Sequence, residues 1–206
     1  MKSKILSLVL CLTLCICFAG CGEKNNTNEN EKGKKEGYGI HHAVMTIKGY
    51  GEIKIELDGD TAPITVENFV TLAKEGFYDG LTFHRSVPGF VLQGGDPDGN
   101  GTGGSGKPIT GEFPQNGIEN KISHKRGVLS MARRGNDMNS ATSQFFIVLD
   151  DAAIPSLDGG YAAFGYVTEG MEIIDKIVSE TPIADSFSGF VETKNQPVIE
   201  SVVITD

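Results

Sequence analysis

Short apolar runs separated by glycine-rich turns recur along most of the chain after residue 42. The segment 52–57 (EIKIEL) alternates apolar and charged positions, which is typical of a strand with one buried face. Together with the apolar run that starts at residue 43 and the Tyr50-Gly51 turn, it predicts a hairpin over 43–57. Six further runs are predicted as strands, at 82–87, 90–93, 128–132, 144–149, 162–167 and 198–204.

Two segments follow a helical period instead. In 63–75, the apolar side chains that recur at i, i+3, i+4 and i+7 are Val66, Phe69, Val70 and Ala73. A second helix is predicted over 171–179, again with one apolar face. Many short strands combined with two helices favour a mainly β fold, a closed barrel with helices at its ends.

The first 20 residues have a different pattern. Lys2 and Lys4 precede an apolar stretch at 5–18, which is shorter than the roughly 20 residues of a membrane-spanning helix. A basic start followed by such a stretch predicts a secretory signal peptide over residues 1–20. The sequence FAGC, which ends at Cys21, resembles the lipobox of bacterial lipoproteins and predicts a lipid on Cys21. An ordinary signal peptide with an incidental cysteine is the alternative.

Residues 22–37 (GEKNNTNENEKGKKEG) contain no aliphatic or aromatic side chain and balance four lysines with four glutamates. Such a segment cannot bury apolar surface. We therefore expect a lipidated cysteine and flexible tether over 21–37, and a folded domain over 38–206. A diacylglycerol group supplies two acyl chains, enough for stable attachment, so the predicted location is the extracytoplasmic face of a bacterial cell membrane.

The amino-acid composition excludes some kinds of chemistry and some partners for the predicted domain. All four cysteines lie at or before residue 21, so the predicted domain has no disulfide and no thiol chemistry. With 18 basic residues against 27 acidic ones, the chain carries a formal net charge of −9. Nucleic-acid binding requires clustered lysine and arginine, so this balance argues against a nucleic-acid partner.

The glycine-rich loop Asp96–Lys107 contains fragments of two ligand-binding motifs. It begins like a calcium-binding loop, but Lys107 occupies the twelfth position, where a glutamate is needed. The pattern GxxxxGK at 101–107 is followed by Pro108, where a serine or threonine has to hold magnesium. A tight surface loop is the preferred interpretation, and neither a metal nor a cofactor is predicted.

Catalytic arrangements of the hydrolase type are not recognisable in the sequence. His124 has no cysteine or carboxylate cluster close to it along the chain, which argues against a metal site. No Ser–His–Asp or Cys–His order stands out either.

Polar side chains interrupt the apolar strands at a few positions. Arg85 and Gln93 stand in the otherwise apolar stretch FHRSVPGFVLQGGD, and Gln144 shares a strand face with Phe146 in SQFFIVL. A phenylalanine that faces away from the core, beside Gln and Arg, predicts an apolar groove with a few convergent polar groups. From periodicity alone a second interpretation stays open, in which Phe146 is ordinary packing and Arg85 a solvated strand charge.

Six segments follow one another in a characteristic order: FHRSVPGFVLQGGD (83–96), GTGG (101–104), GEF (111–113), GVLSMAR (127–133), NSATSQFFI (139–147) and LDGGYAAFG (157–165). In this order they resemble the cyclophilins, which are peptidyl-prolyl cis-trans isomerases. The resemblance implies a closed eight-stranded antiparallel barrel capped by two α-helices, no metal or cofactor, a monomer, and proline-containing polypeptides as substrates.

The same resemblance implies roles for single residues. Arg85 matches the catalytic arginine, which would donate to the prolyl nitrogen of the twisted amide, and Gln93 matches the glutamine that orients it. Phe90, Phe146 and Leu157 match walls of the proline pocket. Other positions along the implied substrate groove are Gly101, Thr102, Ala132, Arg133 and Gln144.

Two substrate-site positions depart from the family pattern. Val91 stands where many members have a methionine, and Tyr161 aligns with a histidine of eukaryotic members. Taken together, the sequence predicts an isomerase that assists the folding of proteins outside the cytoplasm.

Overall fold

The computed structural model describes residues 37–206, so the predicted signal peptide, Cys21 and all but the last residue of the predicted tether lie outside the described residues. None of the helices within that range is long and apolar enough to cross a membrane. The elements are β1 (Ile40–Ile47), β2 (Gly51–Asp58), α1 (Pro63–Lys74), β3 (Thr82–Val87), β4 (Val91–Asp96), β5 (Val128–Met131), β6 (Phe145–Val148), α2 (Ile154–Leu157), β7 (Ala163–Glu169), α3 (Met171–Glu180) and β8 (Ile199–Ile204).

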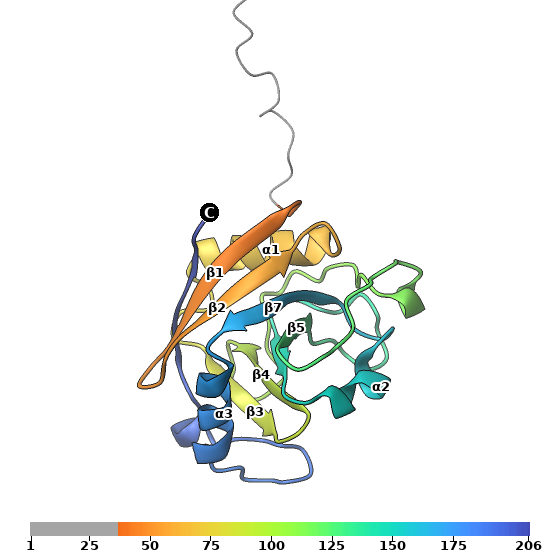
Figure 1. Ribbon diagram of the computed structural model, residues 1–206. Helices are drawn as coiled ribbons and strands as arrows, with labels where there is room; N and C mark the ends of the chain where they lie inside the picture. The colour runs from red at the N-terminus through yellow and green to blue at the C-terminus, as the bar shows by residue number, and fades with distance from the viewer. Residues whose placement is uncertain (1–36) are drawn as a thin grey trace, which may run out of the picture. The chain divides into compact units, whose positions relative to one another are not determined.

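The strands form one antiparallel sheet in the order β3-β4-β6-β5-β7-β2-β1-β8, which curls strongly on itself (Figure 1). Its edge strands meet briefly at one end, where Thr82 and Val198 form an isolated bridge, Phe83 N donates to Pro197 O (2.9 Å) and Ile199 N donates to Leu81 O (2.8 Å). The prediction of a closed barrel is therefore only partly right: the sheet is strongly curled but stays open, because no continuous ladder joins β3 to β8.

The outer edge of β3 is occupied by a different segment, and this explains the incomplete closure. Ser86 N donates to Gly189 O (2.8 Å), Val191 N donates to His84 O (2.9 Å), and Arg85 forms an isolated bridge with Phe190. The loop after α3 thus covers backbone groups that a barrel would pair with β8, and it protects an otherwise open sheet edge.

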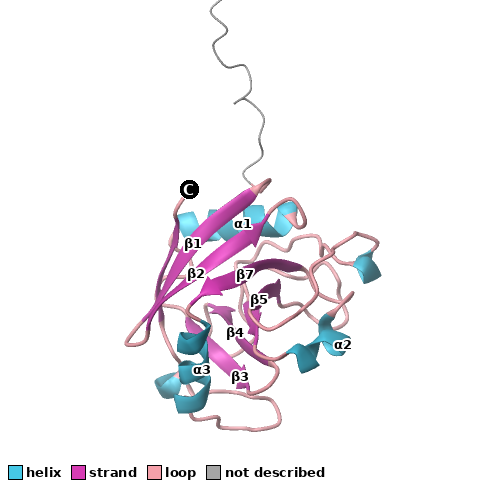
Figure 2. Ribbon diagram, in the orientation of Figure 1, coloured by secondary structure: helices cyan, strands magenta, loops and turns pink. Residues whose placement is uncertain are grey.

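Side chains inside the curl form the main apolar core. The predicted stripe of α1 is confirmed, since Val66, Phe69, Val70 and Ala73 are all buried. Phe69 meets Phe145 of β6 edge to face, with ring centroids 5.7 Å apart. The helix predicted over 171–179 is also confirmed, as α3. Helices α1 and α3 lie toward opposite ends of the sheet (Figure 2).

A second apolar cluster lies on the other face of β4, β5 and β6. It includes Val91, Val128, Phe146 and Leu157, while the neighbouring Phe145 belongs to the main core. Leu157 comes from α2, a third helix that the sequence did not predict because four residues are too few to show a helical period. This outer cluster lies next to polar residues of the same sheet face, since its member Phe146 is the register partner of Gln93.

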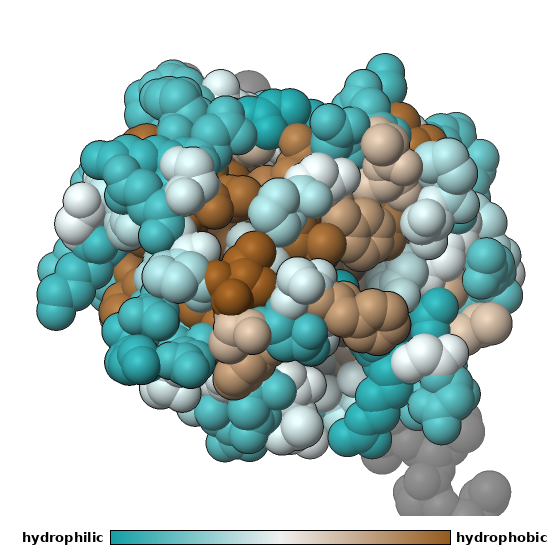
Figure 3. Space-filling view, turned by 90° about the horizontal axis from the view of Figure 1, so that it is seen from below, coloured by the Kyte–Doolittle hydropathy of each residue, from teal (hydrophilic) through white to brown (hydrophobic). Residues whose placement is uncertain are grey.

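Apolar side chains also reach the surface. Seen from below, apolar surface gathers near the centre of the face, with hydrophilic residues around its edge (Figure 3). Of the large apolar side chains exposed within the described residues, Phe187 protrudes most, with 96% exposure. An apolar area inside a polar rim is typical of a contact surface.

Candidate active site

Three neighbouring strands bring Arg85, Gln93 and Phe146 into one row. In the sheet register Arg85 of β3 lies opposite Gln93 of β4, and Gln93 lies opposite Phe146 of β6. Directly paired residues point to the same face of a sheet, so the three side chains are neighbours on the outer face.

A bulge in β3 is needed for this arrangement. The register shifts between Phe83 and Arg85, so that His84 is an extra residue in the strand. Phe83 is buried in the main core while Arg85 faces Gln93. Strict alternation along the strand predicts one face for Phe83 and Arg85, and this expectation is wrong because the bulge resets the alternation.

Hydrogen bonds fix the arginine from two sides. Arg85 Nη1 donates to Gln93 Oε1 (3.2 Å), and Arg85 Nε donates to the carbonyl oxygen of Ser188 (2.7 Å). Two of the five N–H groups of a guanidinium are thereby used. No other residue within 37–206 accepts from Arg85, so the remaining N–H groups are available to a ligand.

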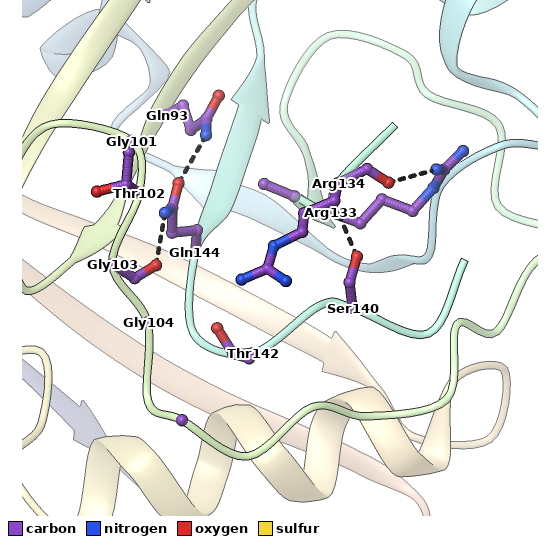
Figure 4. A pocket seen from close by; sticks show the side chains of 12 residues that line it. Gln93, Gly101, Thr102, Gly103, Gly104, Arg133, Arg134, Ser140, Thr142 and Gln144 are labelled. Atoms are coloured by element: carbon purple, nitrogen blue, oxygen red, sulfur yellow. Dashed lines mark hydrogen bonds between the residues drawn. The ribbon is translucent and has the colours of Figure 1, made fainter. Parts of the chain in front are cut away.

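The glutamine that holds Arg85 is itself oriented by further hydrogen bonds. Gln93 Nε2 donates to Gln144 Oε1 (2.9 Å), and Gln144 Nε2 donates to the carbonyl oxygen of Gly103 (2.8 Å), as Figure 4 shows. Because each amide presents its oxygen to one neighbour and its nitrogen to the next, the chain of bonds has a single direction.

The charge of Arg85 is partly removed from water. Burial lowers the pKa of its guanidinium, and the nearby Tyr161 opposes this shift. An arginine starts so far above neutral pH that it remains charged. The guanidinium carbon lies 6.0 Å from the centre of the Phe90 ring, close to the outer apolar cluster. A partly desolvated cation of this kind interacts strongly with an acceptor that reaches it.

Apolar side chains form the wall beside Arg85. Phe146 is only 3% exposed and meets the Tyr161 ring edge to face at 5.7 Å. Val91 and Leu157 belong to the same cluster, and Phe90, Ala132 and Tyr161 pack against it. The structure thus brings together the predicted pocket residues, although Phe146 is more buried than an open groove would leave it.

Behind Phe146 lies a polar cluster that the sequence did not reveal. The buried His124 ring is nearly parallel to the Phe146 ring, with centroids 6.2 Å apart. Its Nδ1 is 2.8 Å from Asp158 Oδ1 and its Nε2 is 2.9 Å from Ser130 Oγ. His124 is therefore not isolated, and these partners lie too far away along the chain for any motif to show them.

This Ser130–His124–Asp158 cluster supports the pocket and is not a hydrolytic triad. Ser130 is completely buried, so its hydroxyl cannot reach a substrate. Burial lowers the pKa of His124 more than its hydrogen bond with Asp158 raises it, which keeps the ring neutral. Since Ser130 is also the register partner of Phe146 in β5, the cluster holds the pocket wall from behind.

On the far side of Gln93 the surface opens into a cavity of about 610 Å³ (Figure 4). The residues expected along the substrate groove lie here, namely Gly101, Thr102, Ala132, Arg133 and Gln144. Arg134, Ser140 and Thr142 also line it and were not predicted. The guanidinium of Arg133 turns away, because its Nε donates to Gly160 O (2.9 Å) and its Cζ lies 4.8 Å from the Tyr161 ring centre.

The glycine-rich loop on this side is organised by Asp96. The buried carboxylate of Asp96 accepts from the backbone N–H groups of Asp98, Asn100 and Gly101, at 2.9, 3.1 and 2.5 Å. These bonds satisfy a tight turn of the kind preferred from the sequence. Within residues 37–206 no three His, Cys, Asp or Glu side chains are grouped so that they could hold a metal ion.

Comparisons with known sequences point to one family. A family model described as cyclophilin type peptidyl-prolyl cis-trans isomerase/CLD matches residues 42–206. A peptidyl-prolyl cis-trans isomerase of Helicobacter pylori is 51% identical over 138 residues, which cover 66% of this chain and 80% of that protein. Peptidyl-prolyl cis-trans isomerase B of Bacillus subtilis is 51% identical over 121 residues, or 59% of this chain and 79% of that protein.

Solved structures agree with the sequence matches. A crystal structure of a Cryptosporidium parvum cyclophilin type peptidyl-prolyl cis-trans isomerase superposes with a TM-score of 0.70 at 30% identity, covering 82% of this chain and 99% of that one. A second crystal structure of the same protein, in the presence of the dipeptide Ala-Pro, gives a TM-score of 0.69, also at 30% identity, and covers 80% and 99%.

Proposed function

The chain belongs to the cyclophilin-type peptidyl-prolyl cis-trans isomerase family, and from that premise we propose that Arg85 drives the isomerisation by stabilising the twisted prolyl amide. The substrates of the reaction are proline-containing polypeptides. The observation that supports the role of Arg85 is its double anchoring by Ser188 and Gln93, with N–H groups left over beside an apolar pocket.

The reaction breaks no covalent bond. An X–Pro amide rotates over a barrier of about 18–20 kcal/mol because resonance keeps it planar. As the bond twists, the nitrogen lone pair leaves conjugation and becomes a hydrogen-bond acceptor. A free N–H of Arg85 donates to that nitrogen mainly in the transition state, which lowers the barrier without strengthening ground-state binding.

The hydrogen bond from Arg85 accounts for only part of the rate acceleration, and the rest of the pocket has to supply the remainder. A hydrogen bond from a charged donor contributes about 1.5–3 kcal/mol. At about 1.4 kcal/mol per tenfold in rate, Arg85 accounts for roughly one to two powers of ten. The remainder comes from holding the proline ring against Phe146, Phe90 and Leu157 while the other side of the bond rotates. A relative crystallised in the presence of Ala-Pro is consistent with a pocket for proline.

The Arg85 proposal is tested by NMR exchange of an Ala-Pro peptide with the purified domain. Arg85→Ala is expected to lower kcat/KM by roughly ten- to a hundredfold, since one charged donor is lost. Arg126→Ala is the matched control, because Arg126 is also hydrogen-bonded on two sides, to Leu149 O and Asp175, but lies outside the row of Arg85.

A module that only binds peptides is the rival function. It would bind the Ala-Pro peptide without accelerating exchange, and its binding would survive Arg85→Ala. Full exchange activity in Arg85→Ala would contradict the proposed role of the arginine.

We also propose that the enzyme acts outside the cytoplasm, attached to the membrane through a lipid on Cys21. The basic start, the apolar stretch at 5–18 and FAGC at the end support a lipoprotein signal, and the polar segment 22–37 supports a tether. An isomerase held there meets secreted chains as they emerge and fold.

The anchor is tested by mass spectrometry of the mature N-terminus from the native host. The expected species begins at Cys21 and carries a diacylglycerol thioether, and Cys21→Ser is expected to leave an unlipidated chain. A mature chain that begins elsewhere, or an unmodified Cys21, would show that the protein is not a lipoprotein.

A further inference from the structure

Arg134 differs from Arg85 and Arg133 because its guanidinium has no partner among residues 37–206. Arg85 and Arg133 both donate to backbone carbonyl oxygens. The guanidinium of Arg134 forms no hydrogen bond or ion pair with any residue of 37–206, although its backbone N–H donates to Ser140 Oγ (2.9 Å). Five donors and a full positive charge are therefore left for a ligand.

The unpaired guanidinium lies in the cavity next to the active site. Figure 4 shows the Arg134 side chain extending toward Gln144 and Thr142, while the Arg133 guanidinium turns the other way and meets the Arg134 carbonyl oxygen. The backbone N–H of Arg134 is tied to Ser140, which itself donates to Asp137 O (2.7 Å), so the base of the side chain is held in place.

Gln93 and Gln144 connect this cavity to Arg85. Both line the cavity, and Gln93 also accepts the hydrogen bond of Arg85 Nη1. Residues of an extended chain are about 3.3 Å apart, so the neighbours of a proline held at Arg85 run across these two glutamines. A client side chain close to the proline in sequence then enters the cavity, where it meets the Arg134 guanidinium, which is unpaired within residues 37–206.

The charge of the cavity lining has one sign. Among residues 37–206 no carboxylate lines the cavity, and the charged residues that do are Arg133 and Arg134. The guanidinium of Arg133 is occupied by the carbonyl oxygens of Gly160 and Arg134. Arg134 is thus left to attract an anion, and the cavity favours an acidic client side chain.

From these contacts we infer that Arg134, in the part of the substrate groove that this cavity forms, selects clients with an acidic side chain flanking the proline by pairing with it. The inference rests on the isomerase function proposed above, because it concerns the choice of substrate for the same site. It makes Arg134 a specificity-determining residue.

The test compares kcat/KM for a series of proline peptides in which each flanking position carries Ala, Glu or Lys in turn. At one position, Glu is expected to exceed Ala by about two- to fivefold, the range of an exposed ion pair, with Lys below Ala. The Glu preference is expected to fall in about 0.5 M salt, where charges are screened over a few ångströms.

Substitutions of Arg134 test whether this residue causes the preference for Glu over Ala. Arg134→Ala is expected to abolish the Glu/Ala ratio, Arg134→Glu to reverse it in favour of Lys, and Arg134→Lys to retain part of it. The ratio cancels any uniform loss of activity in a variant. Lys121→Ala, which removes a surface cation that does not line the cavity, is expected to keep the wild-type ratio.

The outcomes separate this inference from the proposed function. If wild type accelerates no peptide, the isomerase function fails. If wild type accelerates the Ala peptide but no position favours Glu, only the acidic subsite is overturned. A Glu preference that persists in Arg134→Ala, or that is lost in Lys121→Ala, also overturns it.

Discussion

Gln93 is the residue on which the geometry of the site depends most. Its amide oxygen accepts from Arg85 and its amide nitrogen donates to Gln144, while its backbone lies in β4 between β3 and β6. A flipped amide would present a donor to Arg85 and an acceptor to Gln144, so both bonds would be lost. Gln93 is held in place by the strands on both sides of β4, and its amide oxygen in turn orients the Arg85 guanidinium.

Gln93→Leu is expected to lower kcat/KM for an Ala-Pro peptide by roughly tenfold, because the charged donor Arg85 loses its hydrogen bond to the Gln93 amide oxygen, worth about 1.5 kcal/mol. NMR exchange measures the change. Gln144→Leu is the control and is expected to have a smaller effect, since it leaves the Arg85–Gln93 contact in place. An unchanged rate in Gln93→Leu would contradict the orienting role, as would full additivity with Arg85→Ala.

At the scale of elements, the site depends on the segment that covers the outer edge of β3. Gly189 O accepts from Ser86 N, and the preceding carbonyl, that of Ser188, accepts from Arg85 Nε. Gly189 has a φ of +76°, and a Cβ there would contact Val87 and lie 2.6 Å from Ser86 O. Only glycine allows this approach, so a loop outside the catalytic row helps to place the arginine.

Gly189→Ala is expected to destabilise the domain by about 2–3 kcal/mol and to lower turnover, since the loop has to move away from β3 and takes the Ser188 carbonyl with it. Denaturant unfolding and NMR exchange measure the two effects.

Gly117→Ala provides the matched control for Gly189→Ala. Gly117 has a nearly identical φ of +78°, but apart from its chain neighbours no atom of residues 37–206 lies within 4 Å of its Cβ position. It is expected to cost only about 1 kcal/mol and to leave turnover unchanged. Equal effects of the two substitutions would show that contact with β3 is unimportant.

At the scale of the whole molecule, buried histidines couple stability to pH. His84 is buried, and neither ring nitrogen has a hydrogen-bond partner among residues 37–206. Burial lowers its pKa and Arg85 lowers it further, while Asp96 opposes both. The pKa of His124 is shifted in the same direction, again by burial. Both rings are thus held neutral in the fold and gain protons more readily when the chain unfolds.

The unfolding temperature is therefore expected to fall as the pH drops from about 7.5 to about 5. A histidine whose folded pKa is depressed contributes stability above its unfolded pKa, about 6.5, and loses it progressively as the pH falls toward the folded pKa. Calorimetry at a series of pH values measures the slope. His84→Phe is expected to reduce the slope, and a variant with the wild-type slope would exclude His84 as a cause.

The sequence alone determined the features that depend on neighbouring residues. Alternation and helical period located the strands and the buried stripe of α1, and they assigned Phe145 and Phe146 to different faces, which the two apolar clusters confirm. The ordered segments also indicated the family that the comparisons show. Such features are readable because burial repeats within an element at a fixed spacing.

Only the tertiary structure decided how distant segments meet. The bulge at His84 placed Arg85 beside Gln93, the loop around Gly189 replaced β8 along much of the edge of β3, and His124 gained Ser130 and Asp158 as partners. The free guanidinium of Arg134 became visible only once the cavity was formed. The physical reason is that pairing register, edge coverage and cavities depend on contacts between residues far apart in sequence, about which local periodicity carries no information.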